Sequence, residues 1–181
     1  MGVGAFNLVR VSAYRRAGGH QPIRLRPDDD IKLGKILKAT GARSEVVRGH
    51  GTISVEWYDS LGEAITGLMK NSFSVVEYRP LLMVGAILFY LLGGLAPLAA
   101  LLLGSELLRL LGAVGVGIQL AGMLWGTRET GASPLSALLY PFLCVVFAWI
   151  VLRALVLNLW QGGIVWRGTF YPLSELRKNR V

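Results

Sequence analysis

The sequence predicts a small α/β segment followed by about three transmembrane helices. Residues 1–80 hold 12 of the 19 Lys and Arg residues and 8 of the 11 Asp and Glu residues. Between residues 81 and 160 only five residues are charged. That second region contains three apolar stretches, each near the ~20 residues that cross a bilayer core. A chain of 181 residues is long enough for a small domain and a few spans.

The front segment, residues 1–58, is predicted to alternate short strands and helices. Apolar residues over 4–11 indicate a strand. A helix is expected from the aspartates at 28–30 to about Thr40, because its apolar residues recur at helical spacing and Gly41 is a natural stop. Short apolar runs at 46–47 and 53–57 predict two more strands.

Residues 59–79 predict an amphipathic helix. Ser60 and Glu63 have the spacing of a capping box, which marks a helix start. The residues after them place an apolar stripe on one face. Such a helix either lies along the membrane interface or packs on the front segment, and the sequence leaves both alternatives open.

The transmembrane region, residues 80–160, contains spans at about 81–103, 107–125 and 135–157. The first two are joined by very few residues and are expected to form a tight hairpin. Gly122 and Gly126 lie four residues apart, as do Gly117 and Ala121, and small residues at this spacing permit close helix contact.

The orientation of these spans is not simple. Three crossings put the two ends of the chain on opposite sides, yet both the front segment and the tail, residues 161–181, are basic. Cytoplasmic segments carry the excess of Lys and Arg. Arg153 lies near the middle of the third span, where a charge is costly. That segment therefore ends, bends or re-enters near Arg153, and three is a nominal number of spans.

The net charge of +8 fits attraction to anionic lipid. Nucleic-acid binding is excluded, because the basic residues are scattered among acids without a Lys/Arg block. The single cysteine, Cys144, excludes an intrachain disulfide and a cysteine metal site.

The three adjacent aspartates, Asp28, Asp29 and Asp30, have three possible roles. Acids in the first turn stabilise the positive end of a helix dipole. A carboxylate at the mouth of a helix can also act as a general base. A D-x-D metal pair usually follows a buried apolar strand, whereas residues 24–27 are Arg-Leu-Arg-Pro, so this third role is disfavoured.

Two histidines, one tryptophan and the tail are further candidates for binding. His20 and His50 are expected to be ordinary turn residues, since neither lies close to acids in the sequence. Trp57 is either a core or interface aromatic or a stacking platform. In the tail, a cationic residue between aromatics fits an interfacial belt, and the many glycines indicate a closely shaped turn.

Three stretches, in order along the chain, resemble membrane-bound family-2 glycosyltransferases, above all those associated with hopanoid and carotenoid pathways and the ceramide glucosyltransferases. The first is a double-glycine turn before an acidic pair at the head of a helix. The second is an aromatic pair followed by a helix with Gly and Lys-Asn, and the third is a Trp-Arg-Gly-x-x-Tyr element. They occupy residues 18–20 with 28–34, 55–58 with 67–71, and 166–171.

The resemblance implies that the front segment is the C-terminal, acceptor-side part of a nucleotide-diphospho-sugar transferase (GT-A) domain. The implied reaction is an inverting transfer of a sugar from a nucleotide sugar to a lipid hydroxyl at the inner face of the cell membrane. It assigns Asp30 as general base with Asp29 as its partner. The residues that it assigns to substrate binding are Asp28, His20, Trp57, Lys70, Trp166, Arg167 and Tyr171.

Two departures from the family are evident. Glu56 precedes Trp57, where processive members carry a Gln/Arg-x-x-Arg-Trp block. The family's nucleotide-binding half, with its Mg or Mn ligands, is also not in these residues, so no metal ligand is expected here. A longer chain or a separate subunit is expected to supply it. The alternative is a non-catalytic membrane protein, or a degenerate remnant, that binds a lipid or a partner protein.

Overall fold

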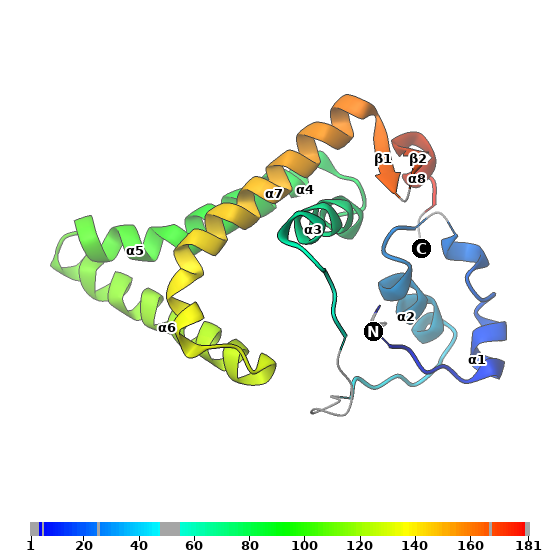
Figure 1. The fold of residues 1–181 in the computed structure, drawn as a ribbon, viewed down its shortest axis with the longest axis horizontal. Coiled ribbons are helices and arrows are strands. Elements are labelled where there is room, and N and C mark those ends of the chain that lie inside the picture. The colour runs from blue at the N-terminus through cyan, green and yellow to red at the C-terminus, as the bar shows by residue number, and fades with distance from the viewer. Residues whose placement is uncertain (1–3, 5, 25, 48–54, 167, 180–181) are drawn as a thin grey trace. The chain divides into compact units, whose positions relative to one another are not determined.

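A computed structural model describes residues 4, 6–24, 26–47, 55–166 and 168–179 (Figure 1). The chain divides into two compact units. We call Met1–Arg79 with Ala154–Val181 the front unit, and Pro80–Arg153 the membrane unit.

The front unit is built mainly from short helices, closed by a strand hairpin at the C-terminal end. Its elements are α1 (Val11–Arg16), η1 (Gln21–Ile23), α2 (Asp29–Ala39), α3 (Leu61–Val75), β1 (Gly163–Trp166), β2 (Thr169–Pro172) and α8 (Leu173–Leu176). A small core forms where α1, η1 and α2 meet. Its buried residues are Ala13, Ala17, Ile23, Leu33, Ile36 and Leu37.

The expected α/β segment is not found in the described residues. Residues 6–10 form no strand, and Val11, expected to end one, begins α1 instead. Residues 46–47 and 55–57 also form no strand, while 48–54 lie outside the described part. The only described strands are β1 and β2, which pair antiparallel with Ile164 opposite Tyr171. An apolar run forms a stable strand only where another strand is available for pairing. The described parts of these three runs have no such pairing strand among the described residues.

The two predicted helices of the front unit are confirmed. α2 begins directly after Asp28, and Gly41 follows its end with φ +82°, a conformation that glycine tolerates. α3 begins with the predicted cap: the Glu63 N–H donates to the Ser60 hydroxyl at 3.2 Å. The Glu63 carboxylate in turn accepts from the Asp59 N–H at 3.2 Å. The capping box therefore sets the start of α3 locally, whereas Asp28 makes no side-chain cap hydrogen bond at the start of α2.

The membrane unit, together with residues 154–161 of the front unit, contains the three long apolar helices that the sequence predicts. Those long enough to span a bilayer are Pro80–Leu103, Glu106–Thr130 and Pro134–Gln161. The first is composed of α4 (Pro80–Leu88), the π-helical turn η2 (Phe89–Gly93) and α5 (Gly94–Leu103). The second is α6 (Glu106–Thr130), and the third joins η3 (Pro134–Leu139) to α7 (Tyr140–Gln161). These helices make the chain a membrane protein.

The hairpin of α5 and α6 is held together at Pro97. Proline has no N–H to return to the carbonyl four residues earlier, that of Gly93. The Gln119 side-chain amide on α6 donates to that carbonyl at 2.5 Å. A Cβ on Gly115 would lie 2.8 Å from the Pro97 Cβ, and one on Gly112 would meet the Pro97 carbonyl oxygen at 2.7 Å. The predicted close contact exists, but at these two glycines; a Cβ on Gly117, Gly122 or Gly126 would meet nothing.

We therefore expect Gly112→Ala to destabilise the hairpin by about 1–3 kcal/mol, because the added methyl must displace backbone of α5. Gly117→Ala is the matched control on the same helix, and we expect it to leave stability unchanged or slightly raised. The measurement is thermal unfolding of the full chain in detergent. Equal midpoints for the two variants would contradict this packing.

Candidate functional site

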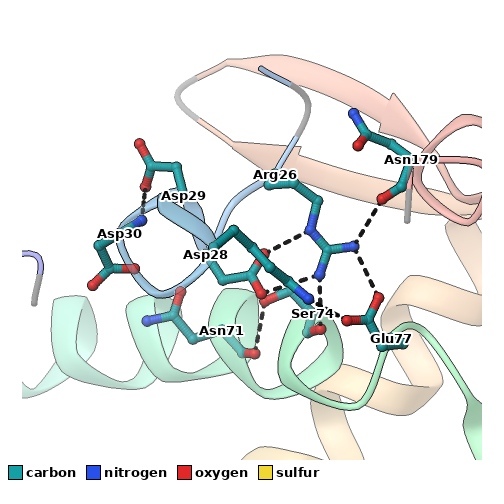
Figure 2. Close-up of polar contacts among 9 residues, drawn as sticks. Arg26, Asp28, Asp29, Asp30, Asn71, Ser74, Glu77 and Asn179 are labelled. Carbon is teal, nitrogen blue, oxygen red and sulfur yellow. Dashed lines mark hydrogen bonds and ion pairs between the residues drawn. The ribbon is translucent and has the colours of Figure 1, made fainter. Parts of the chain in front are cut away.

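A buried arginine, Arg26, lies immediately before the aspartates. The residue is 1% exposed. The guanidinium binds Asp28 with two parallel hydrogen bonds, Nε to Oδ1 at 2.9 Å and Nη2 to Oδ2 at 3.1 Å (Figure 2). Asp28 is itself buried. This fork geometry is the strongest form of an arginine–carboxylate pair, and it engages both oxygens of Asp28.

The same guanidinium ties together three parts of the front unit that are far apart in sequence. It donates to the Ser74 carbonyl of α3 at 3.3 Å, to the Glu77 carboxylate at 3.2 Å and to the Asn179 carbonyl at 3.3 Å. The ring of Tyr78 lies 5.1 Å from its central carbon. Lys32 of α2 adds an ion pair to Glu77. We call these residues the Arg26 cluster: Arg26, Asp28, Lys32, Ser74, Glu77, Tyr78 and Asn179.

The charges of this cluster are mutually compensated. Burial lowers the pKa of Arg26, but the hydrogen bond to Asp28 and the nearby charges raise it above its ordinary value. Burial raises the pKa of Glu77, but the hydrogen bond to Lys32 and the charge of Arg26 bring it below its ordinary value. Burial raises the pKa of Tyr78, so its phenol stays neutral. The cluster is thus a charged assembly that is stable at neutral pH.

The chain bends sharply where α3 ends. Glu77 and Tyr78 have φ values of 54° and 58°, in the left-handed region that non-glycine residues rarely adopt. This conformation costs roughly 1–2 kcal/mol per residue. Both residues contact Arg26, through an ion pair and through the face of a ring. The Arg26 cluster therefore offsets the strain of the turn that precedes α4.

Asp29 and Asp30 face a different environment from Asp28. Figure 2 shows their carboxylates pointing away from the guanidinium of Arg26. Both are partly exposed, and the Asp30 N–H donates to Asp29 Oδ1 at 3.1 Å. They line an open cleft of about 690 Å³. Its described wall is otherwise formed by Gly4, Phe6, Asn7, Leu8, Val9, Val11, Tyr14, His20 and Leu33.

His20 lines the same cleft and is held by Tyr14. The Tyr14 hydroxyl lies 2.6 Å from His20 Nδ1. The glycine turn makes this approach possible: Gly19 has φ +60°, and a Cβ there would lie 3.0 Å from the Tyr14 ring. Sequence reasoning missed Tyr14. The available signal was its position on a short helix just before the Gly18-Gly19 turn.

The structure brings Asp29, Asp30 and His20 together in this cleft, and Trp57, Lys70 and Tyr171 are not among its described lining residues. Trp57 is exposed in the coil before α3. Lys70 on α3 and Tyr171 on β2 are partly buried, and each makes an interaction. The backbone of Trp166 belongs to β1. Arg167 and His50 lie outside the described residues.

A divalent cation has no evident site in the described part of the chain. Those residues contain no group of three or more His, Cys, Asp or Glu side chains placed to hold a metal ion. The D-x-D pair of Asp28 and Asp30 does not form a joint metal site, because both carboxylate oxygens of Asp28 accept hydrogen bonds from Arg26.

Comparison of the chain with protein-family models, with curated proteins and with solved structures gave no match. The cleft combines two carboxylates that can accept protons, a histidine ring and apolar side chains. Such a cleft suits a molecule with a hydroxyl group at one end and hydrocarbon at the other.

Arg26→Met should open the cluster, because Asp28 would remain buried without a partner. Loss of one member of a buried pair costs about 3–5 kcal/mol. We expect faster hydrogen exchange at the amides of α2 and α3 in the full chain. Arg24→Met, two residues away and exposed, is the matched control and should leave exchange unchanged. Adding Asp28→Leu to Arg26→Met should restore part of the protection, and a double variant no better than the single one would argue against the pair.

Acid should weaken the α3–α4 turn through Glu77. A carboxylate whose folded pKa is lowered contributes stability that is present above its ordinary pKa, about 4.5, and lost as the pH falls through the folded pKa. Wild type should therefore unfold at a higher temperature than Glu77→Gln at pH 7, with a difference that shrinks below pH 4.5. A difference independent of pH would contradict this assignment.

Proposed function

We propose that the chain is the acceptor-side and membrane part of a membrane-bound glycosyltransferase. It would transfer a sugar from a nucleotide sugar to the hydroxyl of a membrane lipid, with inversion at the sugar. The supporting observation is that the three adjacent aspartates differ in environment. Asp28 is bound by Arg26, whereas Asp29 and Asp30 line an open, partly apolar cleft.

In this proposal Asp30 is the general base. Its carboxylate accepts the proton of the lipid hydroxyl while the hydroxyl oxygen bonds to the anomeric carbon. The bond from that carbon to the nucleotide diphosphate breaks, and the diphosphate leaves with the electron pair. Asp29, which accepts the Asp30 N–H, fixes the first turn of α2. The apolar lining residues Phe6, Leu8, Val9 and Val11 would hold the hydrocarbon of the lipid.

The donor site belongs to another part of the enzyme in this proposal. The described residues contain one two-stranded hairpin and no nucleotide-binding sheet. The GT-A strands, the nucleotide sugar and the Mg or Mn ion that such enzymes use would be supplied by a longer chain or a separate subunit. The other residues that the resemblance assigns to substrate binding would serve that part: Trp57, Lys70, Trp166, Arg167 and Tyr171. The front unit would lie in the cytoplasm.

A second candidate function fits the lack of a nucleotide-binding sheet among the described residues. Such a front unit also fits a non-catalytic membrane protein. Its cleft would bind a lipid or a segment of a partner protein without chemistry. Asp29 and Asp30 would then only select the ligand.

Asp30→Asn should lower sugar transfer at least about 100-fold, because general bases contribute roughly 10²–10⁴ to the rate. Asp59→Asn, an exposed aspartate outside the cleft, is the control and should keep wild-type activity. The measurement uses protein isolated from its native membranes with any bound subunit, incubated with nucleotide sugars and membrane lipids. Hydrogen exchange of α2 checks that the variant is folded.

Two outcomes would count against this function. Wild-type activity in Asp30→Asn would exclude Asp30 as the base. A complete lack of glycolipid product with wild type would favour the non-catalytic protein. An immunoblot against residues 173–181 separates two cases in advance, because a band well above 19.7 kDa means that the donor part is in the same chain.

A further inference from the structure

The turn after α1 brings His20 back against Tyr14. The Gly19 N–H donates to the Tyr14 carbonyl at 3.0 Å. The Gly18 N–H donates to the Arg15 carbonyl at 3.1 Å, and both glycines have a positive φ, which glycine tolerates. This bonding pattern is the Schellman motif, which ends a helix by reversing the chain. Because His20 follows the reversal directly, its side chain lies beside the helix that has just ended.

Both neighbours of the turn hold His20 in place. The His20 carbonyl accepts the Ile23 N–H at 3.0 Å, and Ile23 is buried in the core of the front unit. Tyr14 packs, partly buried, against the same core. Its hydroxyl lies 2.6 Å from His20 Nδ1, and the centroids of the two rings are 5.5 Å apart. The imidazole is therefore fixed by buried neighbours, although His20 itself is exposed and lines the cleft.

The contact with Tyr14 determines which imidazole nitrogen is left for a ligand. A neutral imidazole has one donor nitrogen and one acceptor nitrogen. When the Tyr14 hydroxyl donates to Nδ1, the hydroxyl proton has an acceptor and the ring proton is on Nε2. In the reverse arrangement the hydroxyl proton would lack a protein acceptor among the described residues. The first arrangement is therefore favoured, and its Nε2–H has no partner in the described part of the chain.

We propose that Tyr14 and His20 select the headgroup of the ligand in this cleft. Tyr14 positions the imidazole, and His20 donates its Nε2–H to an oxygen of the headgroup. The favoured ligand is a neutral alcohol on a hydrocarbon chain, and the disfavoured ligand is an amine on the same chain. This selection rests on the proposed function in that the same cleft takes the lipid hydroxyl, and it applies equally to a non-catalytic protein that binds such a lipid.

The selection follows from the hydrogen-bonding groups of the cleft. Asp29 and Asp30 are the only charged side chains among its described lining residues, and carboxylates accept without donating. Two carboxylates alone would favour an ammonium group, which is cationic and only donates. A hydroxyl both donates and accepts, so its proton can go to a carboxylate while its oxygen accepts from His20. An ammonium cannot accept, and it would leave the Nε2–H unpaired and facing a cation, which lowers affinity.

Nitrogen NMR of the imidazoles tests the positioning by Tyr14. The full chain contains two histidines, so ¹⁵N-labelled histidine reports on two rings in detergent, and His20→Gln assigns the signals of one of them. We expect the neutral His20 ring to carry its proton on Nε2. Tyr14→Phe should shift the Nδ1 resonance, because the hydrogen bond to this nitrogen is lost. A ring proton on Nδ1 in wild type, or an Nδ1 resonance that Tyr14→Phe does not move, would overturn the inference.

Competition between two amphiphiles tests the selection of the headgroup. Dodecanol and dodecylamine have the same hydrocarbon tail, and the amine is a cation at neutral pH. A dodecanol that carries a diazirine is photo-crosslinked to the full chain in detergent, and mass spectrometry measures the label on residues 6–11, which line the cleft in part. The readout is the dodecylamine concentration that halves this label, divided by the dodecanol concentration that does so. Comparing the ratio between variants cancels the different partitioning of the two probes into detergent.

We expect His20→Ala to lower this ratio about 3–10-fold, the factor that one hydrogen bond contributes to affinity. Tyr14→Phe should lower the ratio by a smaller factor, because the imidazole remains but is no longer positioned. His20→Gln should keep part of the selectivity, since glutamine retains an N–H donor. Tyr90→Phe, which removes a tyrosine hydroxyl from η2 in the membrane unit, is the matched control and should leave the ratio unchanged.

The outcomes separate headgroup selection from sugar transfer. An equal ratio in wild type and His20→Ala would overturn the selection even in a chain that makes glycolipid. Crosslinking that does not reach residues 6–11 would also overturn it, because the cleft would then take no such hydrocarbon chain. A ratio that falls in His20→Ala, in a chain that makes no glycolipid, would support the selection and count against the glycosyltransferase alone.

Discussion

The front unit depends on the need to pair one buried charge. An arginine that is 1% exposed is tolerated only where its charge and its donors are satisfied. Arg26 meets this condition by drawing together the start of α2, the end of α3 and the C-terminal segment. The apolar core of the front unit is small, since six residues form its cluster. In so small a unit, the fully hydrogen-bonded guanidinium of Arg26 specifies which segments meet.

That pairing also explains how three identical neighbouring side chains can serve different purposes. Asp28 precedes the first residue of α2 and turns inward to the guanidinium, while Asp29 and Asp30 start the helix and turn towards the cleft. With one carboxylate neutralised, the repulsion among the three is reduced. The structural role and the chemical role are thus divided between adjacent residues, which a count of acids in the sequence does not reveal.

Features that depend on local residues were predictable, and features that depend on distant ones were not. The cap of α3 at Ser60 and the three apolar helices follow from nearby residues, and both predictions were confirmed. The strand expected over 4–11 was wrong, because strand formation depends on a partner that the sequence does not name. The glycines that contact α5 are Gly112 and Gly115, which face Pro97. The four-residue spacing of small residues had indicated Gly117, Gly122 and Gly126 instead. Of the residues that line the cleft, His20, Asp29 and Asp30 were candidates from the sequence. Tyr14 in the cleft and Arg26 outside it were not. Their roles arise from contacts across a turn and across 153 residues.

The contact between Arg26 and position 179 has one more consequence. The guanidinium binds a backbone carbonyl there and no part of the asparagine side chain. Every amino acid presents the same carbonyl, so the contact is indifferent to which residue occupies that position. It is sensitive to spacing, since one residue inserted or removed between α8 and position 179 moves the carbonyl by about 3.8 Å, beyond hydrogen-bonding range. The segment between α8 and position 179 is therefore constrained in length far more than in composition.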